Sequence, residues 1–266
     1  FLDTLHRFTI RTWNSKGTHG SRRKYTRDIQ KRVSYNFRST IMVEKFSLQL
    51  KEGTKKSHSA AENTKFVAGF LRGVLDKKKY RQLLTDFYYV YDTMEQRIRE
   101  SKDTFVNMIT FNELERVDAL ERDLRYYYGP MWRDVQTPTE SCNKYCYRIN
   151  EIAEEDPYLL IAHHYTRYIG DLSGGQILKN IAAKALRNPE GEGLHFYDFP
   201  EIDNAKEWKD GYRCCLDNMD LNEQQKSAII AEANNAFRLN MHIFDEIEGN
   251  AITGFLKVLL ATIRGK

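Results

Sequence analysis

Three glycines interrupt what otherwise has the pattern of one long helix, from about residue 158 to residue 186. Gly170, Gly174 and Gly175 fall within six residues, and Asp171 is set among them. Each glycine in a helix interior costs roughly 1 kcal/mol relative to alanine, so a purely structural helix gains nothing from three. Two interpretations remain: a helix–helix crossing at small residues, or a kinked helix whose backbone closely approaches a large flat ligand.

The rest of the chain carries the spacing of amphipathic helices, which is clearest over residues 77–102. Apolar residues recur there at three-and-four intervals: Tyr80, Leu83, Leu84, Phe87, Tyr91, Met94 and Ile98. Further helices are predicted over residues 46–58, 66–71, 111–128, 139–155, 203–218 and 222–248, and residues 194–199 are expected to be extended. No alternating strand pattern recurs. We therefore predict an all-α, single-domain multi-helix bundle.

Positive charge is concentrated in the first forty residues. Residues 1–40 hold ten Lys or Arg and two Asp, a net charge of +8, whereas the whole chain carries +4, so residues 41–266 carry −4. This remainder offers no basic stripe for nucleic acid. We interpret residues 1–40 as a transit peptide or disordered extension and residues 41–266 as the domain. A basic tail for acidic partners, or sequence upstream of a start at Met42, are the alternatives.

Four cysteines and the apolar segments limit the cellular context. Cys142 and Cys146 are four residues apart, and Cys214 and Cys215 are adjacent. No secretory segment and no further metal ligands accompany them, so we interpret them as reduced thiols rather than disulfides or a zinc site. A transmembrane helix takes about 20 apolar residues. Residues 251–263 are apolar but fewer and include Lys257, which favours a docking or surface helix.

Two blocks of sequence resemble a known family. Residues 163–179, HHYTRYIGDLSGGQILK, are similar to the distal-helix motif of heme oxygenases, and residues 50–63, LKEGTKKSHSAAEN, resemble the proximal-helix motif of that family. The similarity extends from about residue 43 to residue 249. Residues 123–130, DLRYYYGP, are closest to its cyanobacterial and plastid branch. The resemblance implies a heme sandwiched between a proximal helix and the glycine-kinked distal helix.

His58 is the candidate ligand of the heme iron. A lone helical histidine is more often structural, but Glu62 follows one helical turn later and can accept the other ring N–H. Of the other histidines, His163 and His164 lie in the distal block and His242 can simply be packed. The resemblance identifies His58 as the proximal ligand and places Glu62 beside it at the heme b.

On the opposite side, the resemblance assigns Gly170, Gly174 and Gly175 to backbone contact with the heme. It makes Asp171 the distal carboxylate, which holds ordered waters near the oxygen-binding side and does not touch the iron. The alternative for Asp171 is a solvated or capping carboxylate. Further members are expected in this water network: Arg167, Tyr88, Tyr91 and Asn240.

Cations and hydroxyls at the pocket mouth would meet the two heme propionates. The residues that match the family there are Lys51, Tyr165, Lys209 and Arg213. Phe237 is expected to pack on the porphyrin or, equally, in the core. Two positions depart from the family pattern. His164 replaces a small residue and could join the core or crowd the pocket rim, and Gly211 could loosen the helix that carries Lys209 and Arg213.

The resemblance implies an enzyme that opens heme to biliverdin, with the α isomer expected, and releases CO and ferrous iron. Heme is both substrate and cofactor, O2 is consumed, and an external donor supplies electrons. The plastid branch implies reduced ferredoxin as donor, docked on a basic rim that contains Lys51, Lys55, Lys56 and Lys179, and a bilin reductase downstream. The expected location is the plastid (chloroplast) stroma, in soluble form, with the cytoplasm as the alternative.

Two rival functions belong to other classes. A heme carrier or sensor without turnover would keep His58 and the basic residues but lose the distal carboxylate or the glycines. Because Asp171 and all three glycines are present, the enzyme is favoured. A helical bundle without heme, such as a thiamin-degrading enzyme, would need a catalytic thiol in its pocket, and the four cysteines lie outside both motif blocks.

Overall fold

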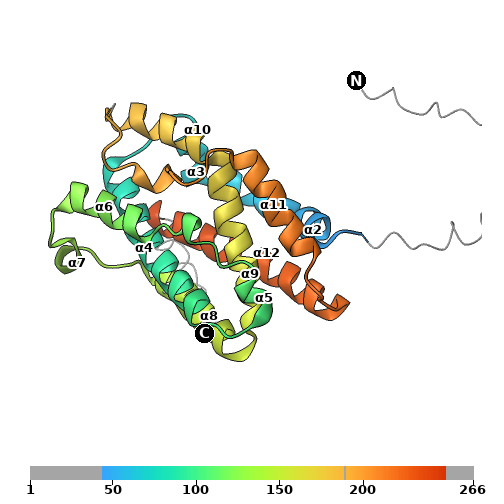
Figure 1. Cartoon of the computed structure of the whole chain (residues 1–266). Coiled ribbons are helices and arrows are strands. Elements are labelled where there is room, and N and C mark those ends of the chain that lie inside the picture. Colours follow the sequence, from blue (N-terminus) through green and yellow to red (C-terminus); the bar gives the residue numbers. More distant parts are fainter. Residues whose placement is uncertain (1–43, 189, 250–266) are drawn as a thin grey trace, which may run out of the picture. The chain divides into compact units, whose positions relative to one another are not determined.

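The computed structural model describes residues 44–188 and 190–249 (Figure 1). The predicted leader, residues 1–40, and the apolar segment 251–263 lie outside the described residues. Within them every regular element is a helix and no strand occurs, as the all-α prediction requires. The elements are α2 (Phe46–Glu62), α3 (Lys65–Leu71), α4 (Lys77–Glu100), α5 (Thr104–Asn107), η1 (Asn112–Leu114), α6 (Val117–Tyr128), α7 (Trp132–Val135), α8 (Glu140–Glu155), η2 (Pro157–Leu159), α9 (Leu160–His164), η3 (Tyr165–Ile169), α10 (Gly170–Ala185), η4 (His195–Tyr197), α11 (Ala205–Asp217) and α12 (Glu223–Ile247).

Helix α4 forms where the apolar spacing predicted it, and its stripe supplies much of the core. The seven apolar positions that defined the pattern are all buried. Asp76 caps its start by accepting a hydrogen bond from the Lys79 amide at 2.9 Å. The helix packs against α6, α8 and α12, so the buried stripe of α4 links three other helices.

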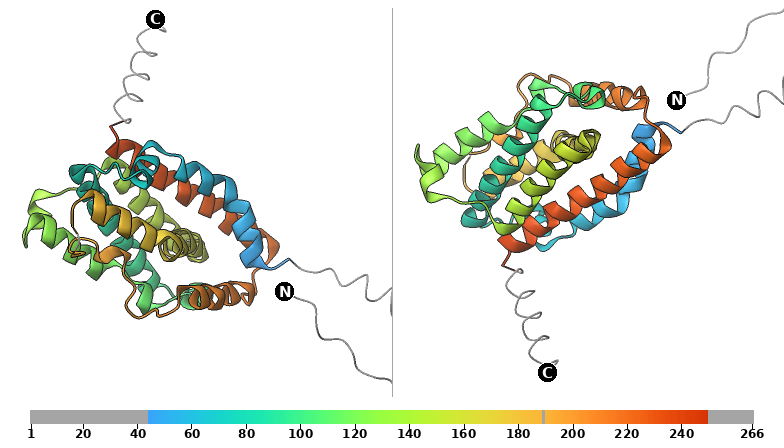
Figure 2. Two further views of the ribbon diagram at one scale, coloured as in Figure 1. Left: turned by 90° about the horizontal axis from the view of Figure 1, so that it is seen from above. Right: turned by 90° about the horizontal axis from the view of Figure 1, so that it is seen from below.

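Helices α2 and α12 lie side by side, as both views of Figure 2 show. Gly53 makes this crossing close, because a Cβ placed on it would lie 2.6 Å from Ile230 Cγ2. Asn234 of α12 joins the two helices, since its Nδ2 donates to Gly53 O at 3.1 Å and its Oδ1 accepts from Ser57 Oγ at 2.5 Å. These contacts fix the position, against α12, of the part of α2 that comes just before His58.

Two sequence expectations about local structure are wrong. The middle of the segment 194–199 is not extended, because His195–Tyr197 form a 3-10 turn. The helix expected from residue 111 begins only at Val117. The Arg116 amide donates to the buried Glu95 carboxylate of α4 at 2.6 Å, and this contact with α4 holds the chain out of the helix just before α6.

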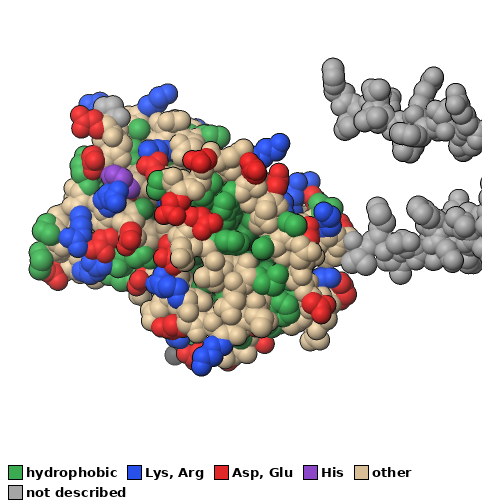
Figure 3. All heavy atoms as spheres, viewed as in Figure 1, with side chains coloured by type: hydrophobic (Ala, Val, Ile, Leu, Met, Phe, Trp, Pro, Cys, Tyr) green, Lys and Arg blue, Asp and Glu red, His purple; other side chains and the backbone are tan. Residues whose placement is uncertain are grey.

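No helix in the described ranges has the length and apolar character needed to cross a bilayer. On the face shown in Figure 3, acidic and basic side chains are interspersed rather than separated by sign.

Candidate active site

The glycine-containing segment is helical throughout, but its geometry changes at one point. Residues Tyr165–Ile169 form a π-helical turn between α9 and α10. A single π turn inside an α-helix adds a residue and frequently occurs at functional sites. The helix is therefore interrupted immediately before Gly170, by a turn that includes none of the three glycines.

Two of the three glycines have no packing partner that requires them. A Cβ on Gly170 would meet nothing within 4 Å, and one on Gly174 would meet only Leu178 of its own helix, at 3.9 Å. Gly175 is buried, and its Cβ would lie 3.7 Å from Tyr197 O. A helix–helix crossing therefore does not explain Gly170 and Gly174. They leave bare backbone facing open space, as close approach by a flat ligand needs.

Asp171 is the centre of a buried polar network on the distal side. The Tyr91 hydroxyl of α4 donates to Asp171 Oδ2. Arg167 Nε donates to the Tyr91 hydroxyl at 3.0 Å, and Arg167 Nη1 donates to Asn240 Oδ1 at 2.7 Å. Arg167 Nη2 lies 4.0 Å from Asp171 Oδ1. The structure thus joins Arg167, Tyr91 and Asn240 to Asp171.

Burial and the neighbouring polar groups shift the pKa of Asp171 in opposite directions. Burial raises the pKa of its carboxyl, while the Arg167 charge, the Tyr91 hydrogen bond and the Arg116 charge act to lower the pKa, and the net shift is upward. Burial likewise raises the pKa of Tyr91 well above its usual value. The Tyr91 hydroxyl is therefore neutral and a hydrogen-bond donor at ordinary pH, beside a carboxyl that is readier than usual to hold a proton.

The expectation for Tyr88 is not met. Its hydroxyl accepts from Arg133 Nη2 at 2.5 Å, and its ring packs edge-on against Trp132 of α7. Tyr88 and Tyr91 are three residues apart and fit the sequence pattern equally well. They differ only in the direction in which each side chain leaves α4, and only the Tyr91 hydroxyl reaches Asp171.

On α2, His58 is accessible and positioned by two neighbours. Its side chain is 57% exposed, and its Nδ1 lies 3.6 Å from Glu62 Oε2, close to the separation of a hydrogen bond. The Phe237 ring of α12 meets the imidazole edge-on, with 5.8 Å between centroids. Phe237 is therefore beside the candidate ligand rather than deep in the core. His58 is free to bind a metal through its remaining ring nitrogen.

The residues predicted for the propionates lie on three elements: Lys51 on α2, Tyr165 at the start of η3, and Lys209 and Arg213 on α11. Lys209 Nζ donates to Ser173 Oγ of α10 at 3.0 Å, and Arg213 Nη1 donates to Asp210 Oδ1 at 2.6 Å. Tyr165 is near Arg213: burial raises the pKa of Tyr165, and a hydrogen bond with Thr54 and the Arg213 charge oppose the shift. Lys51 extends from α2, exposed, three residues before Thr54.

The remaining sequence candidates have structural roles. His163 is fully buried, with Nε2 3.1 Å from Glu232 Oε1 and Nδ1 3.3 Å from the Tyr145 hydroxyl. His164 is in the core rather than at the pocket rim. It stacks on Tyr212 with its Nδ1 2.9 Å from that hydroxyl, and burial lowers its pKa to about 3.

Gly211 does not interrupt α11, which runs unbroken from Ala205 to Asp217. The four cysteines are free thiols. Cys142 Sγ donates to Asp86 O, and Cys215 Sγ to Met108 O. Neither contact includes a predicted site residue, so the thiol-dependent alternative gains no support. Among the described residues, no group of three or more His, Cys, Asp or Glu side chains is placed to hold a metal ion.

Several residues that shape the site were not predicted. Gly53 and Asn234 orient α2, and the only sequence signal was a glycine inside the proximal block. Glu95 of α4 accepts from the Tyr168 hydroxyl at 2.9 Å as well as from the Arg116 amide. Burial raises the pKa of Glu95 to about 7. No motif marks Glu95, because its role depends on a contact with a residue 73 positions away.

The helical fold carries an accessible histidine on α2 and, on α10, a bare glycine face beside a largely buried carboxylate. This arrangement suits heme, a flat group that needs an axial nitrogen ligand. The donor set and the open space at Gly170 and Gly174 fit it. Known proteins place the chain accordingly. The sequence model of the family described as heme oxygenase matches residues 44–246.

Individual relatives agree. A heme oxygenase of Guillardia theta is 46% identical over 82% of this chain and 93% of its own length. Heme oxygenase 1 of Nostoc is 46% identical over 82% of this chain and 92% of its own. The crystal structure of heme oxygenase-1 from Synechocystis in complex with heme superposes with a TM-score of 0.75, at 42% identity, and covers 82% of this chain and 99% of that one.

The chain belongs to the heme oxygenase family. It is an enzyme that opens heme oxidatively to biliverdin and releases CO and ferrous iron. Heme is at once substrate and cofactor, and O2 and reducing electrons are consumed.

Proposed function

We propose that this chain performs the family reaction with His58 as the axial iron ligand and Asp171 as the distal carboxylate that holds ordered water on the oxygen-binding side, while the position of the distal helix selects the α edge of the ring. The observation that carries the proposal is the position of Asp171. Asp171 accepts a hydrogen bond from the Tyr91 hydroxyl and lies beside Arg167. Gly170 and Gly174, on the same helix, face open space. Bound heme would supply both the redox-active iron and the ring carbon that is oxidised.

The side chain of His58 supports its assigned role through accessibility and orientation. Its Nδ1 lies 3.6 Å from Glu62 Oε2, so a small approach of the two side chains would let the carboxylate accept the Nδ1–H, hold one tautomer and leave Nε2 as the iron-binding atom. Phe237 restricts rotation of the imidazole ring from the α12 side.

Asp171 would act by holding water and moving a proton. Its carboxylate is 14% exposed, so part of it can accept hydrogen bonds from water while the Tyr91 hydroxyl occupies Oδ2. Arg167 and Tyr91 keep the carboxylate fixed. General acid–base assistance of this kind contributes about 10²- to 10⁴-fold in rate.

At the mouth, the heme propionates would be bound by Lys209, Arg213, Tyr165 and Lys51. Lys209 already donates to Ser173 on the glycine-containing helix, so a propionate bound there would be held next to the distal side. Arg213 would exchange its exposed partner Asp210 for a propionate at small cost, because exposed ion pairs contribute only about 0–1 kcal/mol.

The expected electron donor is reduced ferredoxin, a small acidic protein, docked on the rim of Lys51, Lys55, Lys56 and Lys179. The first three side chains are exposed on α2. Lys179 is half-buried and paired with Asp198, so it is the weakest member of this rim. The similarity to heme oxygenases of algae and cyanobacteria supports this assignment. A bilin reductase is proposed as the enzyme that acts downstream on biliverdin. The plastid stroma is proposed as the location, with residues 1–40 as the leader and residues 41–266 as the domain; the cytoplasm is the alternative.

The test is a spectral titration of the purified chain with hemin, followed by electrons from a ferredoxin system under oxygen. A Soret band should appear and then decay as biliverdin and ferrous iron accumulate. Replacing ferredoxin with a chemical donor tests the partner separately. A Soret band that persists under oxygen and reductant would identify a heme carrier instead, and no Soret band would overturn the role of His58.

A further inference from the structure

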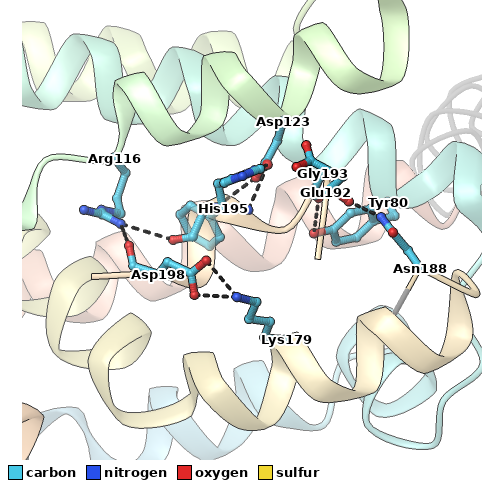
Figure 4. A network of polar contacts seen from close by, with 10 residues as sticks. Tyr80, Arg116, Asp123, Lys179, Asn188, Glu192, Gly193, His195 and Asp198 are labelled. Carbon is cyan, nitrogen blue, oxygen red and sulfur yellow. Dashed lines mark hydrogen bonds and ion pairs between the residues drawn. The ribbon is translucent and has the colours of Figure 1, made fainter. Parts of the chain in front are cut away.

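A short turn, Leu194 to Asp198, lies in the chain between α10 and α11. Its central part, η4, contacts both α6 and α10 and so bridges these two helices. On the α10 side, Lys179 Nζ lies 2.6 and 2.7 Å from the two carboxylate oxygens of Asp198, and Gln176 Nε2 donates to Tyr197 O at 3.2 Å. Figure 4 shows Lys179 reaching from α10 to Asp198. The position of α10 is therefore tied to the position of the turn.

On the α6 side, the turn is held by one buried carboxylate. Asp123 is 0% exposed and accepts three hydrogen bonds, each 2.8 Å long, from His195 N, His195 Nδ1 and Phe196 N. All three partners donate, which suits an ionised carboxylate. Burial raises the pKa of Asp123 and these bonds oppose the rise. The imidazole is the only side chain among the three donors, as Figure 4 illustrates.

Arg116 and Tyr80 hold the ends of the same turn. Arg116 Nη1 donates to Asp198 O, and its guanidinium lies 3.9 Å from the centre of the Phe199 ring. The Tyr80 hydroxyl donates to Gly193 O at 3.4 Å. These bonds restrict where the turn begins and ends, whereas Asp123 fixes its middle.

The middle of the turn touches the distal site directly. The Phe196 ring packs against the Tyr91 ring at 5.6 Å and the Phe87 ring at 5.5 Å. Tyr91 is the donor to Asp171. Tyr197 O lies in van der Waals range of Gly175, at 3.7 Å from the position of a Cβ there. A displacement of the turn would therefore reach both Tyr91 and the backbone of α10.

We propose that Asp123 and His195 are a positioning pair for the distal helix. The buried carboxylate fixes the turn, the turn fixes α10 at Gly175 and Gln176, and the pair thereby narrows oxidation to one edge of the substrate ring. Neither residue touches the substrate. The effect on the ring edge rests on the proposed function, whereas the hold of the pair on α10 does not.

Four variants separate the positioning role from general stability. Asp123→Asn replaces an acceptor with a donor opposite a backbone N–H, and His195→Leu removes the side-chain donor. His195→Asn is the rescue variant, because its Nδ2–H can take the place of Nδ1–H at Asp123. His242→Leu, at an exposed position on α12, is the control. Circular dichroism confirms that each full-length variant is folded.

Two readouts are used: hydrogen–deuterium exchange of residues 170–178 in the heme-free chain, and the biliverdin isomers formed by the heme-loaded chain. Asp123→Asn and His195→Leu should speed exchange about tenfold or more, since each weakens a hydrogen bond to a buried charged group. They should also give mixed isomers. His195→Asn and His242→Leu should match the unmodified chain in both.

Unchanged exchange in folded Asp123→Asn and His195→Leu would overturn the positioning role, whatever the product. Faster exchange with a single unchanged isomer would overturn the link to the ring edge. If the unmodified chain forms no biliverdin, the proposed function is overturned together with the ring-edge link, while the exchange data still decide whether the pair holds α10.

Discussion

The Tyr91 hydroxyl on α4 donates to Asp171 on α10, a bond between residues 80 positions apart in the sequence. The same oxygen accepts from Arg167 Nε at 3.0 Å. The carboxylate and the guanidinium are themselves 4.0 Å apart. The Tyr91 hydroxyl, rather than a close ion pair, therefore holds the two charged groups in a fixed arrangement.

Asp171→Ala should leave heme affinity within about threefold of the unmodified value while biliverdin formation falls about 100-fold, in the range for loss of acid–base assistance. The reason is that Asp171 would position water and a proton without contributing to heme affinity. Hemin titration and single-turnover product analysis measure the two effects. Asp118→Ala, on the exposed face of α6, is the matched control. Ring opening at the normal rate in Asp171→Ala would refute the role of the carboxylate.

His58→Ala should lower hemin affinity at least about tenfold, a change of about 1.4 kcal/mol, and shift the Soret band because the axial nitrogen is lost. Since the His58 side chain is 57% exposed, added imidazole should enter the vacated position and restore the spectrum. His242→Ala serves as the control. A spectrum in His58→Ala that matches the unmodified chain without imidazole would mean that another residue binds the iron.

Glu95 should make folding stability depend on pH between about 4.5 and about 7. Burial raises its pKa from 4.5 to about 7, so in this window the folded chain binds more protons than the unfolded chain. The Glu95 contribution to the free energy of unfolding therefore falls as the pH rises, by roughly 3 kcal/mol in total.

Urea unfolding of the unmodified chain and of Glu95→Gln across this range measures the Glu95 effect by difference. The subtraction is needed because burial also raises the pKa of Asp86, to about 6, and adds a slope of the same sign. Glu95→Gln should flatten the profile. Parallel pH profiles for the two proteins would show that Glu95 is already ionised in the folded state below the window.

Gly53→Ala and Gly211→Ala should have opposite effects on stability. A Cβ on Gly53 meets Ile230 Cγ2 at 2.6 Å, whereas one on Gly211 meets nothing within 4 Å. Overpacking at the α2–α12 crossing should cost about 1–3 kcal/mol, and alanine in the exposed helix interior should add roughly 0.5–1 kcal/mol. Thermal unfolding measures both. Addition of Ile230→Ala should recover part of the Gly53→Ala loss, and equal destabilisation by both glycine variants would contradict this account.

Local patterns were enough to predict the helices that pack through one continuous stripe. Helix α4 was found within two residues of its observed end because all seven apolar positions serve one buried face. The roles of His58 and Asp171 stay predictions, which the sequence supports because each residue belongs to a compact motif of neighbouring positions.

What the sequence missed depends on contacts between distant segments. The start of α6 is displaced because Glu95 of α4 takes the Arg116 amide. The turn at residues 194–198 is stabilised by Asp123, more than 70 positions earlier. Tyr88 and Tyr91 could not be separated because they differ only in rotation about α4, which packing against α7 and α10 decides. Such choices are set by tertiary structure and leave no periodic signal.

The π turn at Tyr165–Ile169 also decides which changes in length the distal helix can tolerate. The wide turn takes up one residue more than an α-helical turn. Deleting one residue there would therefore give an ordinary α-helix that still presents Asp171 toward Tyr91 of α4. An added residue that the helix takes up in α-helical form would instead rotate everything after it by about 100° about the helix axis, and it would turn Asp171 and the glycine face away from their partners. The wide turn thus lets the chain carry one extra residue between Tyr165 and Asp171 without moving the face that bears the carboxylate.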